Sequence, residues 1–411
     1  MKLLLTNIRQ LLTLDTSQKK LRRGKEMQQI GLLESAWLLI SDGMVAAYGT
    51  MEQSLPVADE SLDCHGKIVF PGLIDSHTHL VFAKPREQEF VQKIQGKSYE
   101  EIAASGGGIL NSAKKIAETP EEELVDSARK RLTEILKTGT TVVEIKSGYG
   151  LTPESELKML RVANHLKQVS PQQIFTTFLG AHTYPAAFKQ NHRAYLDQII
   201  QEMLPEIQSQ KLADFIDVFC ETGFFSPEET IEILEAGKTC GLKPRVHANE
   251  LGLSGGVQAG VEVGARSVDH LEWMGEAEIQ ALANSDTVPT LLPSTALFLK
   301  MEFAPARKLI DAGLGVALAS DYNPGTSPSG NLLFVWALAC MQMRMSPEEA
   351  ITALTHNAAV SLDCESVHGS LAPGKQADFV ITEPMDHFYE IPYFFTKNPI
   401  ESVWIKGKRV C

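Results

Sequence analysis

The sequence predicts an α/β fold, a (β/α)₈ TIM-like barrel with a small composite β domain formed from the N- and C-terminal segments. The chain has 411 residues, which suits a barrel of about 250 residues with additional elements. Its centre alternates short apolar segments with longer amphipathic ones. Both ends consist instead of short segments typical of strands, separated by glycine-containing turns.

The two ends of the chain are expected to form one domain. Short apolar segments lie at 3–8 and 36–49 near the start, and at 374–384 and 401–410 near the end. In the last of these, Lys406-Gly407-Lys408 suits a hairpin turn. We therefore predict a composite, β-sandwich-like domain from residues 1–66 and 362–411, beside a catalytic barrel formed by residues 67–361.

The centre contains eight segments with the composition of buried strands: 69–77, 140–148, 174–182, 215–221, 244–250, 267–273, 287–293 and 315–321. Amphipathic segments with helical spacing lie between them. Ser226-Pro227 and Ser346-Pro347 each precede two glutamates, which is typical of a helix start. Eight such repeats favour a barrel. The alternative is a doubly wound open sheet, but no glycine-rich phosphate fingerprint follows the first strand.

Composition predicts a cytoplasmic protein that binds neither nucleic acid nor a membrane. Lys and Arg number 38 against 51 Asp and Glu, so the formal charge is −13, whereas binding to phosphates needs a basic face. The longest apolar run, residues 332–341, is about half of a bilayer span and predicts a buried helix. The six cysteines are widely scattered, which is typical of a reducing compartment.

Polar residues gather at the C-terminal ends of the predicted strands, where barrels build their active sites. His77 and His79 are two positions apart, so on an extended strand both imidazoles face the same side. Four more candidates end other predicted strands: His182, His247, His270 and Asp321. Several imidazoles with one carboxylate suit zinc or iron better than magnesium or calcium. The residues alone therefore predict a metal-dependent hydrolase.

The segment PGLIDSHTHL, residues 71–80, followed in order by His247, His270 and Asp321, resembles the amidohydrolase superfamily over nearly the whole chain. The resemblance implies four metal ligands: His77, His79, His247 and Asp321. Members with two metals usually carry a carboxylated lysine on the fourth strand, but segment 215–221 has no lysine. One divalent ion, Zn²⁺ or Fe, is therefore expected.

Six ordered segments are similar, more narrowly, to the imidazolonepropionase family: 71–90, 105–109, 144–151, 178–182, 247–252 and 320–328. This resemblance implies hydrolysis of an anionic small molecule, 4-imidazolone-5-propanoate, to N-formimidoyl-L-glutamate in histidine degradation. It also implies a homodimer. The residues implied to contact the substrate are Arg86, Tyr149, His182, Glu250, Asn323, Gly325 and Thr326.

The resemblance also suggests three catalytic residues. Asp321 would accept a proton from the metal-activated water, and His270 would hydrogen-bond the water and the developing oxyanion. Glu250 would bind the ring N–H or pass a proton to the leaving nitrogen. Which of the three is the principal base stays open.

Several alternatives stay open beside this interpretation. A ring deaminase uses the same metal constellation, dihydropyrimidinase-like enzymes generally need the bridging lysine, and some relatives without ligands are assembly proteins. Arg86 would hold the propionate carboxylate, unless it is a surface arginine paired with Glu87 or Glu89. The segments 184–188 and 393–396 depart from the family pattern, which puts loop geometry and dimer contacts in doubt.

Overall fold

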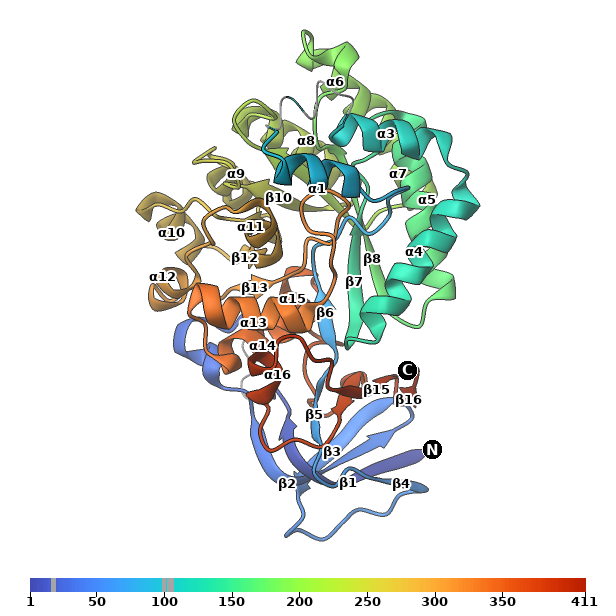
Figure 1. Ribbon diagram of the computed structural model, residues 1–411, viewed down its shortest axis with the longest axis vertical. Coiled ribbons are helices and arrows are strands. Elements are labelled where there is room, and N and C mark those ends of the chain that lie inside the picture. Colours follow the sequence, from blue (N-terminus) through green and yellow to red (C-terminus); the bar gives the residue numbers. More distant parts are fainter. Residues whose placement is uncertain (16–19, 98–100, 102–106) are drawn as a thin grey trace.

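The computed structural model describes residues 1–15, 20–97, 101 and 107–411. The chain forms two eight-stranded sheets. One sheet is a parallel barrel surrounded by helices, and the other forms a smaller domain at one end, where both chain termini lie (Figure 1). The predicted fold class, a (β/α)₈ barrel with a composite β domain, is confirmed.

The smaller sheet has the strand order β16-β15-β14-β5-β1-β2-β3, with β4 also paired to β1. Its strands are β1 (Lys2–Leu12), β2 (Leu32–Ser41), β3 (Met44–Thr50), β4 (Glu60–Asp63), β5 (Ile68–Pro71), β14 (Phe379–Thr382), β15 (Ile400–Ile405) and β16 (Lys408–Arg409). The two ends of the chain meet where Val380 of β14 pairs with Phe70 of β5. Lys406 and Gly407 both have positive φ and form the predicted hairpin turn between β15 and β16.

The barrel strands run in sequence order from β6 to β13, and all neighbours are parallel. They are β6 (Leu73–Asp75), β7 (Thr140–Lys146), β8 (Gln173–Ala181), β9 (Phe215–Cys220), β10 (Lys243–Ala248), β11 (Ser267–His270), β12 (Val288–Leu291) and β13 (Ala317–Leu318). Backbone hydrogen bonds close the barrel just beyond its first and last strands. Asp321 N donates to His77 O at 3.0 Å, and His79 N donates to Tyr322 O at 2.9 Å.

Helices cover the outside of the barrel (Figure 1). They are α1 (Glu87–Ile94), α3 (Ile109–Glu118), α4 (Glu121–Leu136), α5 (Pro153–Val169), α6 (His192–Gln198), α7 (Leu204–Gln210), α8 (Pro227–Thr239), α9 (Gly256–Glu262), α10 (Glu276–Ala283), α11 (Pro293–Leu299), α12 (Ala306–Asp311), α13 (Leu332–Met343), α14 (Pro347–Leu354), α15 (His356–Ser361) and α16 (Glu390–Tyr393). Ser226 and Ser346 cap α8 and α14, each in a capping box, as their sequences predicted. The apolar run at 332–341 is the buried helix α13.

The first predicted barrel strand is wrong in one respect. Segment 69–77 is not one strand: it divides at Gly72 between β5 of the smaller sheet and β6 of the barrel. A Cβ at Gly72 would collide with the side chain of Thr141, so the chain passes between the sheets where only glycine fits. The predicted domain boundary between residues 66 and 67 lies before β5, which is a strand of the smaller sheet.

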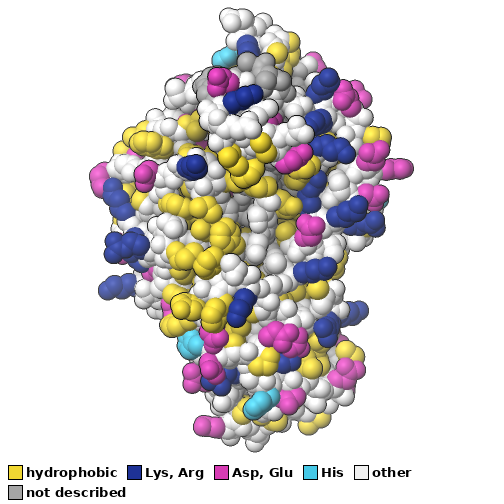
Figure 2. All heavy atoms as spheres, in the orientation of Figure 1, with side chains coloured by type: hydrophobic (Ala, Val, Ile, Leu, Met, Phe, Trp, Pro, Cys, Tyr) yellow, Lys and Arg dark blue, Asp and Glu magenta, His cyan; other side chains and the backbone are white. Residues whose placement is uncertain are grey.

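The core lies in both domains, and the surface over it carries mixed charges. Buried aliphatic side chains fill the smaller domain and the space between the barrel and its helices. On the face drawn in Figure 2, charges of both signs are interspersed and hydrophobic side chains gather over the middle. In the described part of the chain, no helix is long and apolar enough to cross a membrane.

Candidate active site

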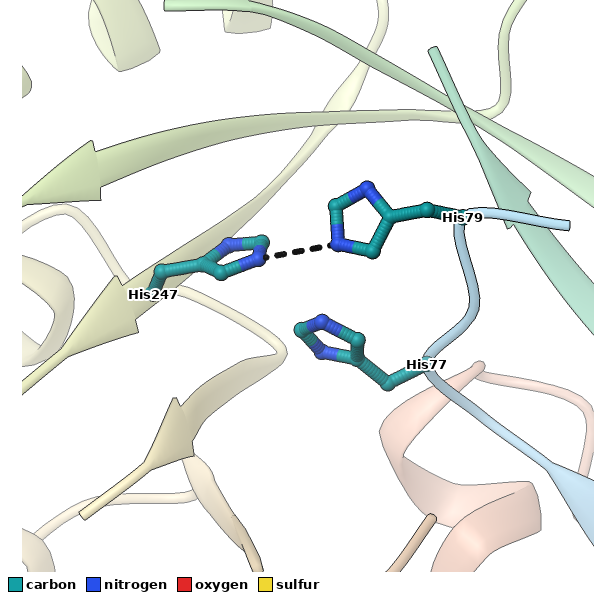
Figure 3. Close-up of side chains that lie close together, drawn as sticks. All are labelled: His77, His79 and His247. Atoms are coloured by element: carbon teal, nitrogen blue, oxygen red, sulfur yellow. Dashed lines mark hydrogen bonds between the residues drawn. The ribbon is translucent and has the colours of Figure 1, made fainter. Parts of the chain in front are cut away.

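Three imidazoles converge at the C-terminal end of the barrel. His77 and His79 follow β6, His247 lies in β10, and their rings approach one another (Figure 3). One nitrogen from each lies within 4.8 Å of the others, and His79 Nε2 is 3.4 Å from His247 Nε2. Among the described residues, no other group of His, Cys, Asp or Glu side chains has this spacing. His77 and His79, two positions apart in the sequence, therefore lie next to His247 of the fifth barrel strand.

Asp321 faces the same point from beyond the last barrel strand. Its Oδ1 lies 3.6 Å from His77 Nε2 and 3.5 Å from His79 Nε2. Thr295 Oγ1 donates a hydrogen bond of 2.6 Å to the other oxygen, Oδ2. Asp321 has a φ of +52°, which is uncommon for a residue other than glycine. Burial raises the pKa of this carboxyl, so Asp321 takes up a proton more readily than an exposed aspartate.

Buried carboxylates orient two of the imidazoles from behind. His77 Nδ1 lies 2.7 Å from Asp269 Oδ2, and His247 Nδ1 lies 3.0 Å from Asp217 Oδ2. The hydrogen bond to Asp269 keeps the proton of His77 on Nδ1, so the lone pair of its Nε2 faces the centre of the cluster. At His247 the negative charge of Asp217 beside Nδ1 favours the same tautomer. His77 Nε2 is buried without a hydrogen-bond partner among the described residues, as expected of an atom that binds a metal.

These carboxylates are themselves paired with buried cations. Lys146 Nζ lies 2.8 Å from Asp217 Oδ2, and Arg245 Nη2 lies 3.0 Å from Asp269 Oδ2. Although burial alone would raise it, His247 and Lys146 hold the pKa of Asp217 well below its ordinary value. Asp217 therefore remains ionised behind the imidazole that it orients.

The imidazoles of His77 and His79 are neutral at pH 7. Burial, reinforced by neighbouring positive charges, lowers the pKa values of His77 and His79 well below their ordinary range. Neutral imidazoles with inward lone pairs can bind a metal without first releasing a proton. The four side chains therefore fit a metal ion, and together they are called the metal cluster: His77, His79, His247 and Asp321.

We expect Asp217→Asn to weaken metal binding by about 10- to 100-fold, the usual effect of losing a group that orients a ligand histidine. An amide cannot hold the proton on His247 Nδ1 as a carboxylate does. A competition titration with a chromogenic chelator measures the affinity. Asp214→Asn is the matched control, because Asp214 pairs with Lys167 at 2.8 Å and has no contact with the cluster. Unchanged affinity in Asp217→Asn would contradict the orienting role.

A cavity of about 360 Å³ opens from the metal cluster toward α1 and α11. Its lining contains six of the predicted substrate contacts: Arg86, Tyr149, His182, Glu250, Asn323 and Thr326. Gly325 is not in the lining, but it packs against Arg86, whose Nη1 leaves no room for a Cβ there. Apolar side chains such as Phe219 and Leu299 complete the wall. The cavity suits a small polar molecule.

His270 and Glu250 stand together at the side of this cavity. His270 Nε2 lies 3.7 Å from Glu250 Oε2, and His270 Nδ1 lies 3.7 Å from Glu272 Oε2. Although burial alone would lower it, these two carboxylates raise the pKa of His270 to about 10. Burial raises the pKa of Glu250 to about 7. Glu221 Oε1 accepts a hydrogen bond of 2.6 Å from the Glu250 backbone N–H and so fixes the Glu250 backbone.

A buried glutamate holds the loop that presents Tyr149 to the cavity. The carboxylate of Glu156 accepts hydrogen bonds from the backbone N–H groups of Gly148 and Gly150, at 2.9 and 2.6 Å. On the other side of the loop, His182 Nδ1 lies 3.0 Å from Gly148 O. Tyr149 and His182 are thereby positioned next to His79.

Arg86 lines the same cavity and is also paired with an acid. Its Nε and Nη2 donate to Glu89 Oε2 at 2.8 and 2.5 Å, and its backbone N–H donates to Pro324 O at 3.3 Å. Arg86 thus pairs with Glu89, as one interpretation expected, but it is not a surface residue, because its side chain is only 9% exposed.

The atypical segments lie away from the cavity. Neither 184–188 nor 393–396 contributes to its lining. Tyr184 is buried, with its ring stacked 3.7 Å from that of His192, whereas Tyr393 is exposed at the end of α16. In the glycine-rich segment 105–109, residues 105 and 106 lie outside the described part of the chain.

Comparison with known proteins decides the family. Residues 68–410 match the amidohydrolase family. The chain is 50% identical to the imidazolonepropionase of Flavobacterium johnsoniae, over 98% of this chain and 99% of that protein. It is 42% identical to the imidazolonepropionase of Bacillus cytotoxicus, over 98% and 96%. The chain belongs to the imidazolonepropionases of the amidohydrolase family. It is therefore a hydrolase.

Solved structures share the amidohydrolase fold. The atrazine chlorohydrolase of Arthrobacter aurescens, complexed with zinc, has a TM-score of 0.72 at 17% identity, over 99% of this chain and 95% of that one. An adenosine deaminase from Xanthomonas campestris, with bound zinc, has a TM-score of 0.69 at 16% identity, over 99% and 92%. At these identities the likeness concerns the fold alone.

Sequence reasoning missed the charged residues beneath this amidohydrolase site. Asp217, Lys146 and Arg245 lie inside segments predicted as buried strands, and Asp269 directly precedes His270. A charged residue in the middle of an apolar strand is expensive to bury unless it is paired. Asp217 in FIDVFCE and Lys146 in EIKSG were signals of this kind.

Proposed function

We propose that the residues around this cavity carry out the imidazolonepropionase reaction, the hydrolysis of 4-imidazolone-5-propanoate to N-formimidoyl-L-glutamate in histidine degradation. One observation carries the assignment to these residues: a single cavity is lined both by members of the metal cluster and by Arg86. A cyclic amide with a carboxylate side chain needs both.

A single divalent ion, Zn²⁺ or Fe, completes the site in this proposal, held by the metal cluster. Two features support one ion. The described residues contain one cluster of metal-binding geometry, and the fourth barrel strand, β9, carries no lysine that could bridge a second ion. When bound, such an ion lowers the pKa of a coordinated water from about 15.7 toward about 7 and so supplies hydroxide near neutral pH.

The side chains then divide the proton transfers. Asp321 accepts the proton of the attacking water, because its carboxylate faces the point where His77 and His79 converge. His270 donates a hydrogen bond to the oxyanion that develops at the imidazolone carbonyl. The C–N bond breaks as the carbonyl carbon becomes a carboxylate. Glu250 binds the ring N–H or passes a proton to the leaving nitrogen, and its distance of 3.7 Å from His270 supports a shared path.

The remaining cavity residues orient the substrate. Arg86 holds the propionate carboxylate, and Tyr149 and His182 contact the ring from the side of His79. Asn323 and Thr326 also line the cavity, and Asn323 Nδ2 donates to Thr326 Oγ1 at 2.7 Å. Gly325 acts by leaving room for the Arg86 guanidinium. Fixing the substrate in this way supplies part of the rate enhancement through orientation.

Hydrolysis in H₂¹⁸O tests the proposal. Purified protein and enzymatically generated 4-imidazolone-5-propanoate should give a formimidoyl-glutamate with one ¹⁸O in its new carboxylate and no ammonia. Release of ammonia would identify a deaminase instead.

The rate should depend on the ionisation of Glu250. Burial raises its pKa to about 7, so the carboxylate that accepts the ring N–H is lost as the pH falls through about 7. We expect kcat/KM to fall on the acid side of this value, and Glu250→Gln to remove that dependence along with most of the activity. The exposed Glu276→Gln is the control. A pH profile unchanged in Glu250→Gln would contradict the assignment.

The homodimer, the cytoplasmic location and the absence of a nucleic-acid partner stay predictions.

A further inference from the structure

Lys93 places a second cation in the cavity, which the motifs did not reveal. Arg86 immediately precedes α1 and Lys93 lies in its last turn. Seven residues are about two helical turns, so both side chains project from the same face of α1. Both line the cavity that reaches the metal cluster.

The charge of Arg86 is already compensated. Its Nε and Nη2 both donate to Glu89 Oε2, and the side chains of this ion pair are only 9% and 10% exposed. The second oxygen, Glu89 Oε1, accepts a hydrogen bond of 2.9 Å from the backbone N–H of Gly108. Arg86 and Glu89 together thus contribute donors and shape to the cavity but little net charge.

Lys93 has no such counter-ion. In the described part of the chain, no carboxylate lies within ion-pair distance of its Nζ, which instead lies over the ring of Phe298, 5.8 Å from the centroid. Lys93 is half-buried. Burial and the charge of Arg86 lower its pKa, although the more distant carboxylate of Glu89 acts in the opposite direction. A partly desolvated ammonium without a carboxylate gains most from binding an anion.

We propose that Lys93 supplies the uncompensated positive charge that selects a carboxylate on the substrate, while the Arg86–Glu89 pair orients it. The inference rests on the proposed function, because it assigns Lys93 to the side-chain carboxylate of the imidazolone. Lys93 is then a specificity-determining residue, distant from the bond that breaks. Its loss should impair binding of the carboxylate more than the chemical step.

Two stable inhibitors distinguish binding of the carboxylate from binding of the ring: imidazole-4-propanoate and its neutral amide. Wild-type protein should prefer the carboxylate, and Lys93→Met should reduce that preference about tenfold, the loss expected for one charge-assisted contact. KM for 4-imidazolone-5-propanoate should rise by about the same factor, with a smaller change in kcat. Lys93→Arg should recover most of the preference.

Lys97→Met is the matched control, because Lys97 is exposed just beyond α1 and does not line the cavity. It should behave as wild type. Equal weakening of the acid and the amide by Lys93→Met would show a packing role and overturn the proposal, as would an unchanged preference. If wild-type protein fails to turn over the imidazolone, the proposed function fails, but the ratio of the two inhibition constants still tests the charge of Lys93.

Discussion

Asp321→Asn is expected to lower kcat by about 10³-fold, within the range of about 10² to 10⁴ that general acid–base groups contribute. The amide keeps the size of the side chain and can still meet Thr295, but it cannot accept the proton of the attacking water. It also removes the carboxylate whose Oδ1 lies 3.5 and 3.6 Å from two ligand imidazoles. Steady-state kinetics at saturating metal measure the loss.

Two controls accompany this variant. Asp311→Asn changes an exposed aspartate that pairs with Arg307 on α12 and should leave kcat unchanged. An unchanged melting temperature of Asp321→Asn would show that the loss is chemical. Turnover close to wild type in Asp321→Asn, with metal bound, would contradict the role of Asp321 as proton acceptor.

His270→Asn is expected to lower kcat by about 10²-fold or more while the metal content stays at wild-type level. His270 donates to the developing oxyanion in this account, and removing one such donor typically costs about 10²- to 10³-fold. It is not one of the four residues of the metal cluster, so metal should still bind. Asparagine is chosen because His270 has a φ of +85°, a region that asparagine tolerates better than most residues.

The measurement pairs kcat with metal analysis of the same sample. His165→Asn, on the exposed side of α5, is the control and should match wild type in both. Loss of the metal in His270→Asn would make His270 a ligand and contradict the division of roles between His270 and the metal cluster.

The barrel could be predicted because its strands and helices are each marked locally. Ser226 and Ser346, each followed by Pro-Glu-Glu, mark helix starts, and most barrel strands are short apolar runs that end in polar residues. Barrel topology brings the polar strand ends together and so predicted a metal site there. Which four of those residues form the metal cluster was implied by the resemblance to the amidohydrolase superfamily. The division at Gly72 could not be predicted, because an unbroken apolar segment looks the same in one sheet or in two.

The charged layer behind the imidazoles and the role of α1 depend on contacts between distant positions. Asp269 lies 192 residues from the imidazole that it orients, and Lys146 lies 71 residues from Asp217. No local pattern specifies such a pairing. Likewise, the sequence could not decide whether Arg86 pairs with an acid or reaches the substrate site. The structure shows Arg86 paired with Glu89 while its backbone N–H bonds to the loop at Pro324.

In the proposed mechanism, a metal-activated water opens an imidazolone ring in this barrel. The most direct test follows the ultraviolet absorbance of enzymatically generated 4-imidazolone-5-propanoate with purified protein, with and without a chelator. We predict rapid loss of absorbance without ammonia, abolished by the chelator and restored by one equivalent of Zn²⁺ or Fe²⁺. No turnover by protein shown to contain metal, or turnover that the removal of all metal leaves unchanged, would contradict the account.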